Sequence, residues 1–287
     1  MHEYRLQHRI SHADVDFLGE LKLAALLGLL EQAAVEASAE VGFDAAWYSR
    51  EGRIWIIRRT RIERSLPVGG GDLIEVETQV ADYRRARSLR RYVVSRHASG
   101  ETARVATATT DWVYCDLATG RPASIPESMQ RAFSGPEPAP VLARAERLPA
   151  GGSGAAVDLD LIVRPSDLDH VVHVNNAVYG SFLEDGGFAL FAARGWSLER
   201  MLATGGALRV RRLDAEYLAD ATAGDRLTVH SWLEGEGDLD AASAEAPARA
   251  TLVQSITRRS GAGGEVMRAR SEWRWLARPA VVGGIPD

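Results

Sequence analysis

The chain has 287 residues, of which 46% are hydrophobic and 25% are charged, and its formal net charge is −5. This length is sufficient for two domains of ordinary size, each with its own core. The mild acidity argues against a nucleic-acid-binding protein, which needs a coherent basic face, and no apolar run approaches the length of a membrane span. One cysteine, Cys115, excludes an internal disulfide, and no apolar leader precedes Tyr4, so we expect a cytoplasmic protein.

The first half of the sequence predicts a short strand, a long helix and then several strands. A strand-like segment at 4–10 leads through an Asp-rich turn into a helix predicted over 21–41. Apolar residues recur there at helical spacing, and the front of the helix is apolar nearly all round, so other elements should surround it. Gly42 is placed to end this helix in the left-handed conformation. Strand-like runs separated by polar or Gly-rich turns follow at 53–64, 72–83, 88–97 and 102–116.

The second half repeats this order after a change of composition. Residues 134–156 are rich in Pro, Gly and Ala, as is typical of a linker, so we expect domains at 1–133 and 157–287. A strand at 158–164, an Asp-rich turn and a helix at about 176–194 come next, and Gly195 is placed to end the helix. A polar segment at 235–247 predicts a long hairpin loop. The remaining strands are predicted at 207–217, 225–234, 248–258 and 265–276. A buried helix followed by antiparallel strands, twice over, predicts an α+β fold in which each sheet wraps around its helix.

The two halves also match residue by residue at a spacing of 153 positions. The Ser-His-Ala-Asp-Val-Asp segment at 11–16 returns as Arg-Pro-Ser-Asp-Leu-Asp at 164–169. This pairs Asp14 with Asp167 and Asp16 with Asp169. The other matches are Gly42 with Gly195, Glu63 with Glu216, Gly71-Asp72 with Gly224-Asp225 and, at a wider spacing of 161, Asp111-Trp112 with Glu272-Trp273. A register held at this many positions indicates a duplicated domain.

One segment of the second copy resembles a known signature. It reads Asp167-Leu-Asp-His-Val-Val-His-Val-Asn-Asn176 and continues as Ala177-Val-Tyr-Gly-Ser-Phe-Leu-Glu184. This is similar to the Asp-x-x-x-His-Val-Asn-Asn-x-x-Tyr signature of hotdog-fold thioesterases, and the tandem layout resembles the acyl-acyl-carrier-protein thioesterase family from about residue 4 to residue 276. The resemblance implies two tandem hotdog domains, each an antiparallel sheet wrapped around a central helix, packed as a pseudo-dimer.

The resemblance also implies an activity and a partner. The chain would hydrolyse thioesters and release fatty acyl chains from acyl-carrier protein in fatty acid biosynthesis. Its partner would be an acyl-carrier protein bearing an acyl-phosphopantetheine thioester. The chain would be a monomeric pseudo-dimer or a homodimer, with no nucleic acid and no membrane involved.

The active residues of that family lie in the second copy. Asp169 and His173 match by position, and Asp220 falls on the later acidic position. Val171 stands where plant members carry an asparagine, and Ala221 stands where they carry a cysteine. The chemistry suits these residue types, because a carboxylate bonded to an imidazole can deprotonate water and the imidazole can then protonate the departing thiol.

Other polar residues near the motif have competing interpretations. The start of the second long helix, near Asn176, offers backbone N–H groups for an oxyanion. Asn175 and Asn176 are expected to serve the turn and the helix N-cap, with a substrate-binding role for one of them left open. Asp14 and Asp167 are expected to be turn residues. Asp16 could be a relic, a turn residue or a wall of an acyl pocket, because Glu20 stands where the second copy has His173.

Two further features are interpreted from composition. The basic hairpin with Arg87, Arg90 and Arg91, beside the arginines of 58–64, could be a solvated sheet face or could bind an acidic carrier protein. Neither a cofactor nor a metal is expected, because the seven histidines lack ligand spacing and no phosphate-binding glycine loop precedes a helix. The tryptophans expected in the core are Trp47, Trp55, Trp112 and Trp273.

Three functions compete with hydrolysis of acyl-carrier-protein thioesters. The first is an acyl-CoA thioesterase of the same fold. The second, a hotdog hydratase, is disfavoured because the segment from Asp169 to His173 lacks the Asn-Pro pair of those enzymes. The third is a non-catalytic acyl-binding protein, which Val171 makes tenable.

Overall fold

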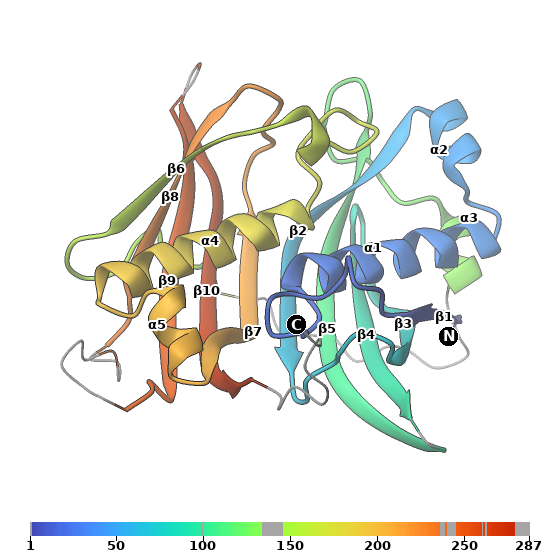
Figure 1. Ribbon diagram of the computed structural model, residues 1–287. Coiled ribbons are helices and arrows are strands. Elements are labelled where there is room, and N and C mark those ends of the chain that lie inside the picture. The colour runs from blue at the N-terminus through green and yellow to red at the C-terminus, as the bar shows by residue number, and fades with distance from the viewer. Residues whose placement is uncertain are drawn as a thin grey trace.

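The computed structural model describes residues 2–98, 100–133, 146–235, 239, 245–259, 261 and 263–278. Its strands form one antiparallel sheet, and the two long helices lie end to end on one face of it (Figure 1). The order across the sheet is β1-β3-β4-β5-β2-β7-β10-β9-β8-β6. The strands are β1 (Glu3–Arg9), β2 (Arg53–Arg64), β3 (Leu73–Arg84), β4 (Arg87–Ala98), β5 (Glu101–Asp116), β6 (Val157–Ile162), β7 (Gly206–Tyr217), β8 (Arg226–Leu233), β9 (Arg249–Arg258) and β10 (Gly264–Ala277).

The long helices are the two that the sequence predicts. They are α1 (Leu23–Glu40) and α4 (Val178–Ala193), and every predicted helix and strand is present with ends within about two residues of the prediction. Gly42 and Gly195 follow these helices with φ of 92° and 84°, in the left-handed conformation expected of them. The short helices were not predicted, because one or two turns carry too little periodicity; they are α2 (Ala45–Glu51), α3 (Glu127–Phe133) and α5 (Leu198–Ala203). None of the helices in the described part of the chain has the length and apolar character that a membrane span requires.

The two copies join through the central strands β2 and β7. These strands pair antiparallel, and Arg61 lies opposite Asp214. Asp214 is also the residue that corresponds to Arg61 at the repeat spacing of 153. A pseudo-twofold axis therefore passes through this pair. Asp214 also accepts hydrogen bonds from Arg59, at 2.6 Å to its Oδ1, and from Arg61, at 3.1 Å to its Oδ2. The predicted pairing of the copies as a pseudo-dimer thus takes the form of one continuous sheet.

The core is shared between the copies. Helix α1 is buried on most sides, as its composition predicts, and one apolar cluster runs from Leu23 and Ile74 in the first copy to Leu252 and Trp273 in the second. Of the four tryptophans expected in the core, Trp112 and Trp273 are buried, whereas Trp47 and Trp55 are half-buried against a smaller cluster beneath α2 and α3. Cys115 is also buried.

The part of the linker that the structure describes begins at residue 146 and lies against the sheet face that the long helices leave open. Arg59 donates a hydrogen bond to the carbonyl oxygen of Glu146 at 2.5 Å, and Arg268 donates to that of Leu148 at 3.1 Å. Residues 134–145 of the predicted linker, and most of the hairpin loop predicted at 235–247, lie outside the described residues. The domain limits at 1–133 and 157–287 therefore stay a proposal.

Two glycines of α4 allow the helix to pack closer to the sheet than a residue with a Cβ atom at either position would allow. A Cβ atom on Gly187 would lie 2.6 Å from Cζ2 of Trp273, and one on Gly186 would lie 2.5 Å from Cγ1 of Val229. Both neighbours are fully buried and have no room to move. Helix and sheet are therefore in direct contact along this part of the second copy.

We predict that Gly187→Ala lowers the free energy of unfolding by about 1–3 kcal/mol, because overpacking displaces Trp273. The matched control is Gly28→Ala in α1, where the new Cβ would meet nothing nearer than 3.9 Å. There the better helix propensity of alanine should stabilise the protein by about 0.5–1 kcal/mol. Urea denaturation measures both changes, and equal effects of the two substitutions would contradict this account of the packing.

Candidate active site

The turn that carries Asp169 and His173 is held by its own hydrogen bonds. Backbone N–H of Asp169 donates to the carbonyl oxygen of His173 at 2.9 Å, and N–H of Val172 donates to that of Asp169 at 3.1 Å. The Asp169 carboxylate also accepts from backbone N–H of Val171 at 2.9 Å through Oδ1. The aspartate thus fixes the turn with one carboxylate oxygen.

The first copy builds the same turn bond for bond. N–H of Asp16 donates to the carbonyl oxygen of Glu20 at 2.9 Å, and Oδ1 of Asp16 accepts from N–H of Leu18 at 2.7 Å. The preceding aspartates also act as predicted, because Asp14 accepts from Ser11 and Asp167 accepts from Arg164. Any difference in activity between the copies must therefore come from side chains around the turns.

Val172 is strained in the second turn. Its φ is 66°, in the left-handed region, whereas the corresponding residue of the first turn is Gly19, with φ of 79°. A β-branched residue in this region is a genuine outlier, and such strain is concentrated at functional sites. The Val172 side chain is 60% exposed, so burial does not compensate for the strain.

The structure brings His173 and Asp220 together. His173 Nε2 lies 3.1 Å from Oδ2 of Asp220, and both side chains are about half exposed. The segment after β7 holds this arrangement in place, because Val174 N–H donates to the carbonyl oxygen of Ala221 at 2.8 Å and Thr222 donates to that of Val172 at 3.1 Å. The His173–Asp220 pair is therefore accessible to solvent. Hydrogen bonds between the two loops fix the backbone that carries it.

The two asparagines lie where the turn enters helix α4. Oδ1 of Asn175 accepts a hydrogen bond from backbone N–H of Ala177 at 2.7 Å, which closes the turn directly before the helix, whereas the N-cap residue is Ala177 and no side chain caps it. The carbonyl oxygen of Asn176 accepts one from the Tyr217 hydroxyl at 3.4 Å. The positive end of the α4 dipole consequently lies beside the turn with Asp169 and His173.

One residue at this site was missed by sequence reasoning. Glu31 belongs to α1 of the first copy, yet its carboxyl group lies near the side chain of Asn175 and the charge of Asp169. Burial, and next the Asp169 charge, raise the pKa of Glu31, whereas the hydrogen bond from Asn175 lowers it. The signal that could have revealed Glu31 was its match with Glu184 at the repeat spacing.

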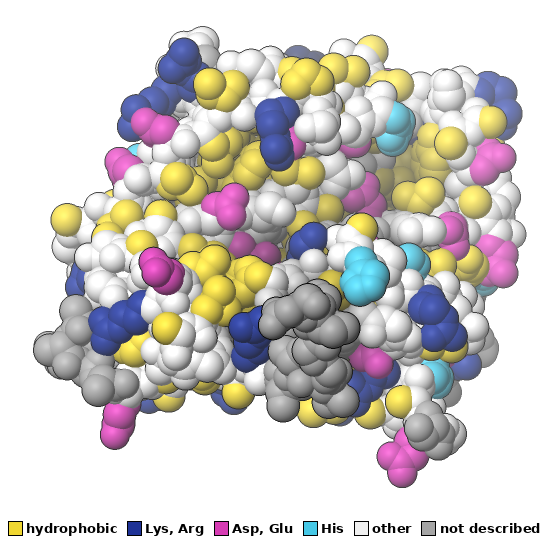
Figure 2. All heavy atoms as spheres, in the orientation of Figure 1, with side chains coloured by type: hydrophobic (Ala, Val, Ile, Leu, Met, Phe, Trp, Pro, Cys, Tyr) yellow, Lys and Arg dark blue, Asp and Glu magenta, His cyan; other side chains and the backbone are white. Residues whose placement is uncertain are grey.

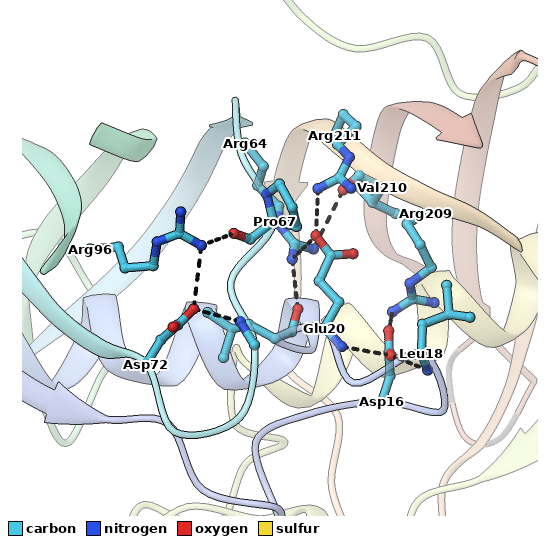
Figure 3. A network of polar contacts seen from close by, with 12 residues as sticks. Asp16, Leu18, Glu20, Arg64, Pro67, Asp72, Arg96, Arg209, Val210 and Arg211 are labelled. Atoms are coloured by element: carbon cyan, nitrogen blue, oxygen red, sulfur yellow. Dashed lines mark hydrogen bonds and ion pairs between the residues drawn. The ribbon is translucent and has the colours of Figure 1, made fainter. Parts of the chain in front are cut away.

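The corresponding place in the first copy is filled by arginines (Figure 3). Arg209 Nη2 lies 2.6 Å from Asp16. The same nitrogen lies 2.8 Å from Glu184, and all three side chains are buried. Glu20, at the position of His173, pairs with Arg64 at 3.0 Å and with Arg211 at 2.5 Å. Asp16 is therefore a buried ion-pair partner and not the wall of an open pocket.

The second copy has different residues at these positions. Ile56 corresponds to Arg209, Tyr217 to Arg64 and Arg58 to Arg211. Arg58 donates to the carbonyl oxygen of Leu218 at 3.3 Å. The Asp169 turn thus lacks the arginine that neutralises its counterpart in the first copy.

The prediction for the basic hairpin was wrong for Arg90. Its side chain is buried, its guanidinium lies 5.3 Å from the centre of the Phe133 ring, and burial lowers its pKa. Arg90 packs inside the first copy, where a partner protein cannot reach it. Arg87 is exposed but pairs with Asp111, and Arg91 lies in an outer-face groove on β4.

Among the described residues, no group of three or more His, Cys, Asp or Glu side chains is arranged to hold a metal ion. The chemistry available at the site is that of carboxylates, one imidazole and the backbone dipoles of a helix start.

We predict that Arg209→Met lowers the free energy of unfolding by about 3–5 kcal/mol, because Asp16 and Glu184 would be left as uncompensated buried charges. Arg212→Met is the matched control, since Arg212 pairs with Glu63 at 2.8 Å while both side chains are about half exposed. This exposed pair should contribute about 1 kcal/mol or less. Chemical denaturation measures the free energy of unfolding of both variants. If Arg209→Met loses no more stability than Arg212→Met, the prediction is wrong.

We also predict that Val172→Gly stabilises the protein by about 1 kcal/mol, as release of the backbone strain outweighs the added flexibility of glycine. The reciprocal change, Gly19→Val, places the same side chain on the same backbone in the first copy. It should destabilise by about 1–3 kcal/mol. Thermal unfolding of the two variants tests the pair, and shifts of the same sign would refute the assignment of strain.

Comparison with known proteins finds a family model for each copy. Residues 1–133 match the family model for the acyl-ACP thioesterase N-terminal domain, and residues 163–271 match that for the thioesterase-like superfamily. A chloroplastic acyl-acyl carrier protein thioesterase of Arabidopsis thaliana, ATL2, is 31% identical over 84 residues, which span 29% of this chain and 45% of that protein. The chain thus aligns with less than half the length of this curated relative.

Two solved structures have the same fold along nearly the whole chain. An acyl-ACP thioesterase from Bacteroides thetaiotaomicron superposes with a TM-score of 0.73 at 19% identity, over 95% of this chain and 98% of that one. A 12:0-ACP thioesterase from Umbellularia californica gives 0.71 at 20% identity, over 96% and 98%. The tandem hotdog fold is thereby confirmed, with a first copy that matches the acyl-ACP thioesterase N-terminal domain and a second copy that matches the thioesterase-like superfamily.

Proposed function

We propose that this protein is a thioester hydrolase that releases fatty acyl chains from acyl-carrier protein in fatty acid biosynthesis. The observation that carries the proposal is the accessible His173–Asp220 pair on the turn of Asp169, directly before the start of helix α4. A cytoplasmic location is part of the proposal, since one buried cysteine suits a reducing compartment.

The arrangement suggests a sequence of proton transfers. When Nε2–H of His173 donates to Asp220, the lone pair on Nδ1 is free to take a proton from water. The resulting hydroxide attacks the thioester carbon, and the dipole at the start of α4 favours the negative charge that develops on the carbonyl oxygen. Collapse of this intermediate breaks the C–S bond. The imidazolium returns its proton to the departing thiolate, so the products are a carboxylic acid and a thiol.

Asp169 has two roles in this proposal. Its Oδ1 maintains the turn on which His173 sits, and its negative charge favours the imidazolium that forms during attack. Asp220 holds the imidazole in the required tautomer and orientation. Asn175 fixes the turn directly before α4 and thereby helps to position the dipole that faces the acyl carbonyl.

An apolar substrate tail is consistent with the surroundings. The face that carries the helices is hollowed above α1 and above α4, and hydrophobic side chains are visible in both hollows (Figure 2). Val35, one helical turn beyond Glu31, is 56% exposed, and Ile56 is 36% exposed. Apolar side chains exposed together beside a polar site favour an acyl chain over a small polar substrate.

The second candidate function is hydrolysis of acyl-CoA. It is favoured by the match of residues 163–271 to the thioesterase-like superfamily, which is not restricted to carrier-protein substrates by its description. Parallel assays with acyl-carrier protein and acyl-CoA of the same chain length distinguish the two candidates through kcat/KM.

We predict that His173→Ala lowers kcat/KM for acyl-carrier-protein thioesters by about 10²–10⁴-fold, because the general base is lost. Asp169→Asn should also lower it, and Asp220→Asn should have the smallest effect of the three because its carboxylate is the most exposed. His230→Ala is the matched control, since His230 forms a similar pair with Asp158, at 2.7 Å, on β8 away from the turn. Full activity in both His173→Ala and Asp169→Asn would disprove the site. Tight binding of acyl chains without hydrolysis by the wild type would favour the non-catalytic alternative.

A further inference from the structure

Glu31 is contributed to the second-copy site by the first copy. It lies in α1, is half-buried, and faces the turn of the other copy near the side chain of Asn175. Asn175 has its Oδ1 engaged by the N–H of Ala177, so its amide nitrogen is the group left to donate to Glu31. The carboxyl group of one copy therefore lies beside the turn that leads into α4 of the other.

The pseudo-twofold axis provides independent evidence for this geometry. The counterpart of Glu31 is Glu184 in α4, which reaches the first-copy turn in the same way. There Glu184 Oε1 and Asp16 Oδ2 both contact a single nitrogen, Nη2 of Arg209, at 2.8 and 2.6 Å. The duplicated fold thus sets a helix glutamate opposite the turn aspartate on both sides of the axis.

The two sides differ in what lies between the carboxylates. In the first copy Arg209 neutralises both, whereas Ile56 occupies the corresponding position for the second copy. We propose that Glu31 is a positioning residue of the second-copy site, which holds the Asn175 amide at the start of α4 and sets a second carboxylate opposite Asp169. The inference rests on the proposed function, and it means that the active site is assembled from both copies.

The charged and titratable groups that face Glu31 come from three elements. Asp169 and His170 lie on the turn, Tyr92 on β4 and Tyr217 on β7. Asp169 opposes ionisation of Glu31, whereas His170, when protonated, favours it. Without an arginine between them, the two carboxyl groups face each other uncompensated, and the charge of Asp169 contributes to the raised pKa of Glu31.

The pair can be tested directly by ¹³C NMR titration of the side-chain carboxyl groups in the full-length protein. We expect Glu31 to titrate above the ordinary glutamate range, and we expect Asp169→Asn to move its titration to lower pH. Glu36 is the internal control, because it lies on the same helix but hydrogen-bonds to Tyr4 at 2.6 Å, away from the turn. An identical Glu31 titration with and without Asp169 would overturn the inference. This measurement needs no substrate, so it remains decisive if the wild type hydrolyses no thioester and the proposed function fails.

Activity provides the second test. Glu31→Gln keeps an acceptor for Asn175, so kcat should stay close to that of the wild type. Glu31→Ala releases Asn175, and kcat should fall by about 10- to 100-fold through misplacement of the site. Glu36→Gln should leave kcat unchanged. If the wild type is active and Glu31→Ala keeps full kcat, or Glu31→Gln loses as much as Glu31→Ala, the inference is wrong and the proposed function survives.

Discussion

The antiparallel pairing of β2 with β7 is the interaction on which the rest of the molecule depends. It joins two five-stranded halves into one sheet and puts Arg61 opposite Asp214 on a pseudo-twofold axis. Because the strands are fixed in this register, α1 and α4 meet at their N-terminal turns, where Gly180 leaves room for Leu27. Each turn that leads into a long helix is then within reach of the other copy's helix.

The same backbone frame supports two opposite outcomes. In the first copy three arginines and three carboxylates fill the space around the turn as buried ion pairs, with charges in balance. Such a network contributes little net stability compared with an apolar core, but it is costly to break. In the second copy the turn keeps its hydrogen bonds, while His173 and Asp220 remain half exposed. A shared backbone with exchanged side chains therefore separates a buried, charge-neutralised turn from an accessible one.

Most of the fold could be predicted from the sequence, and the reasons are local. The apolar face of residues 23–37 identifies α1, and the matches at a spacing of 153 reveal the duplication without any knowledge of the fold. The short helices α2, α3 and α5 lacked a sufficient pattern. The single continuous sheet depends on contacts between β2 and β7, which are 155 residues apart where Arg59 meets Asp214, and alternation within a strand does not specify its neighbour.

The site could be predicted in part. Asp169, His173 and Asp220 came from resemblance to a signature, and the structure places His173 beside Asp220 across 47 positions of sequence. Glu31 was missed because a glutamate on a helix usually faces solvent, and Arg209 was missed because its partners come from both copies. A residue that contacts the other copy has no pattern in the neighbouring sequence that reveals this contact. The repeat spacing does, however, pair Glu31 with Glu184.

Arg209 has a consequence for how such a protein can arise. In a dimer of identical subunits, an arginine at this position would appear twice and would block both equivalent sites at once. Covalent joining of the two copies in one chain removes that constraint, since a substitution then affects one side alone. One half was thereby free to become a rigid, charge-neutralised support, while the other kept an open centre.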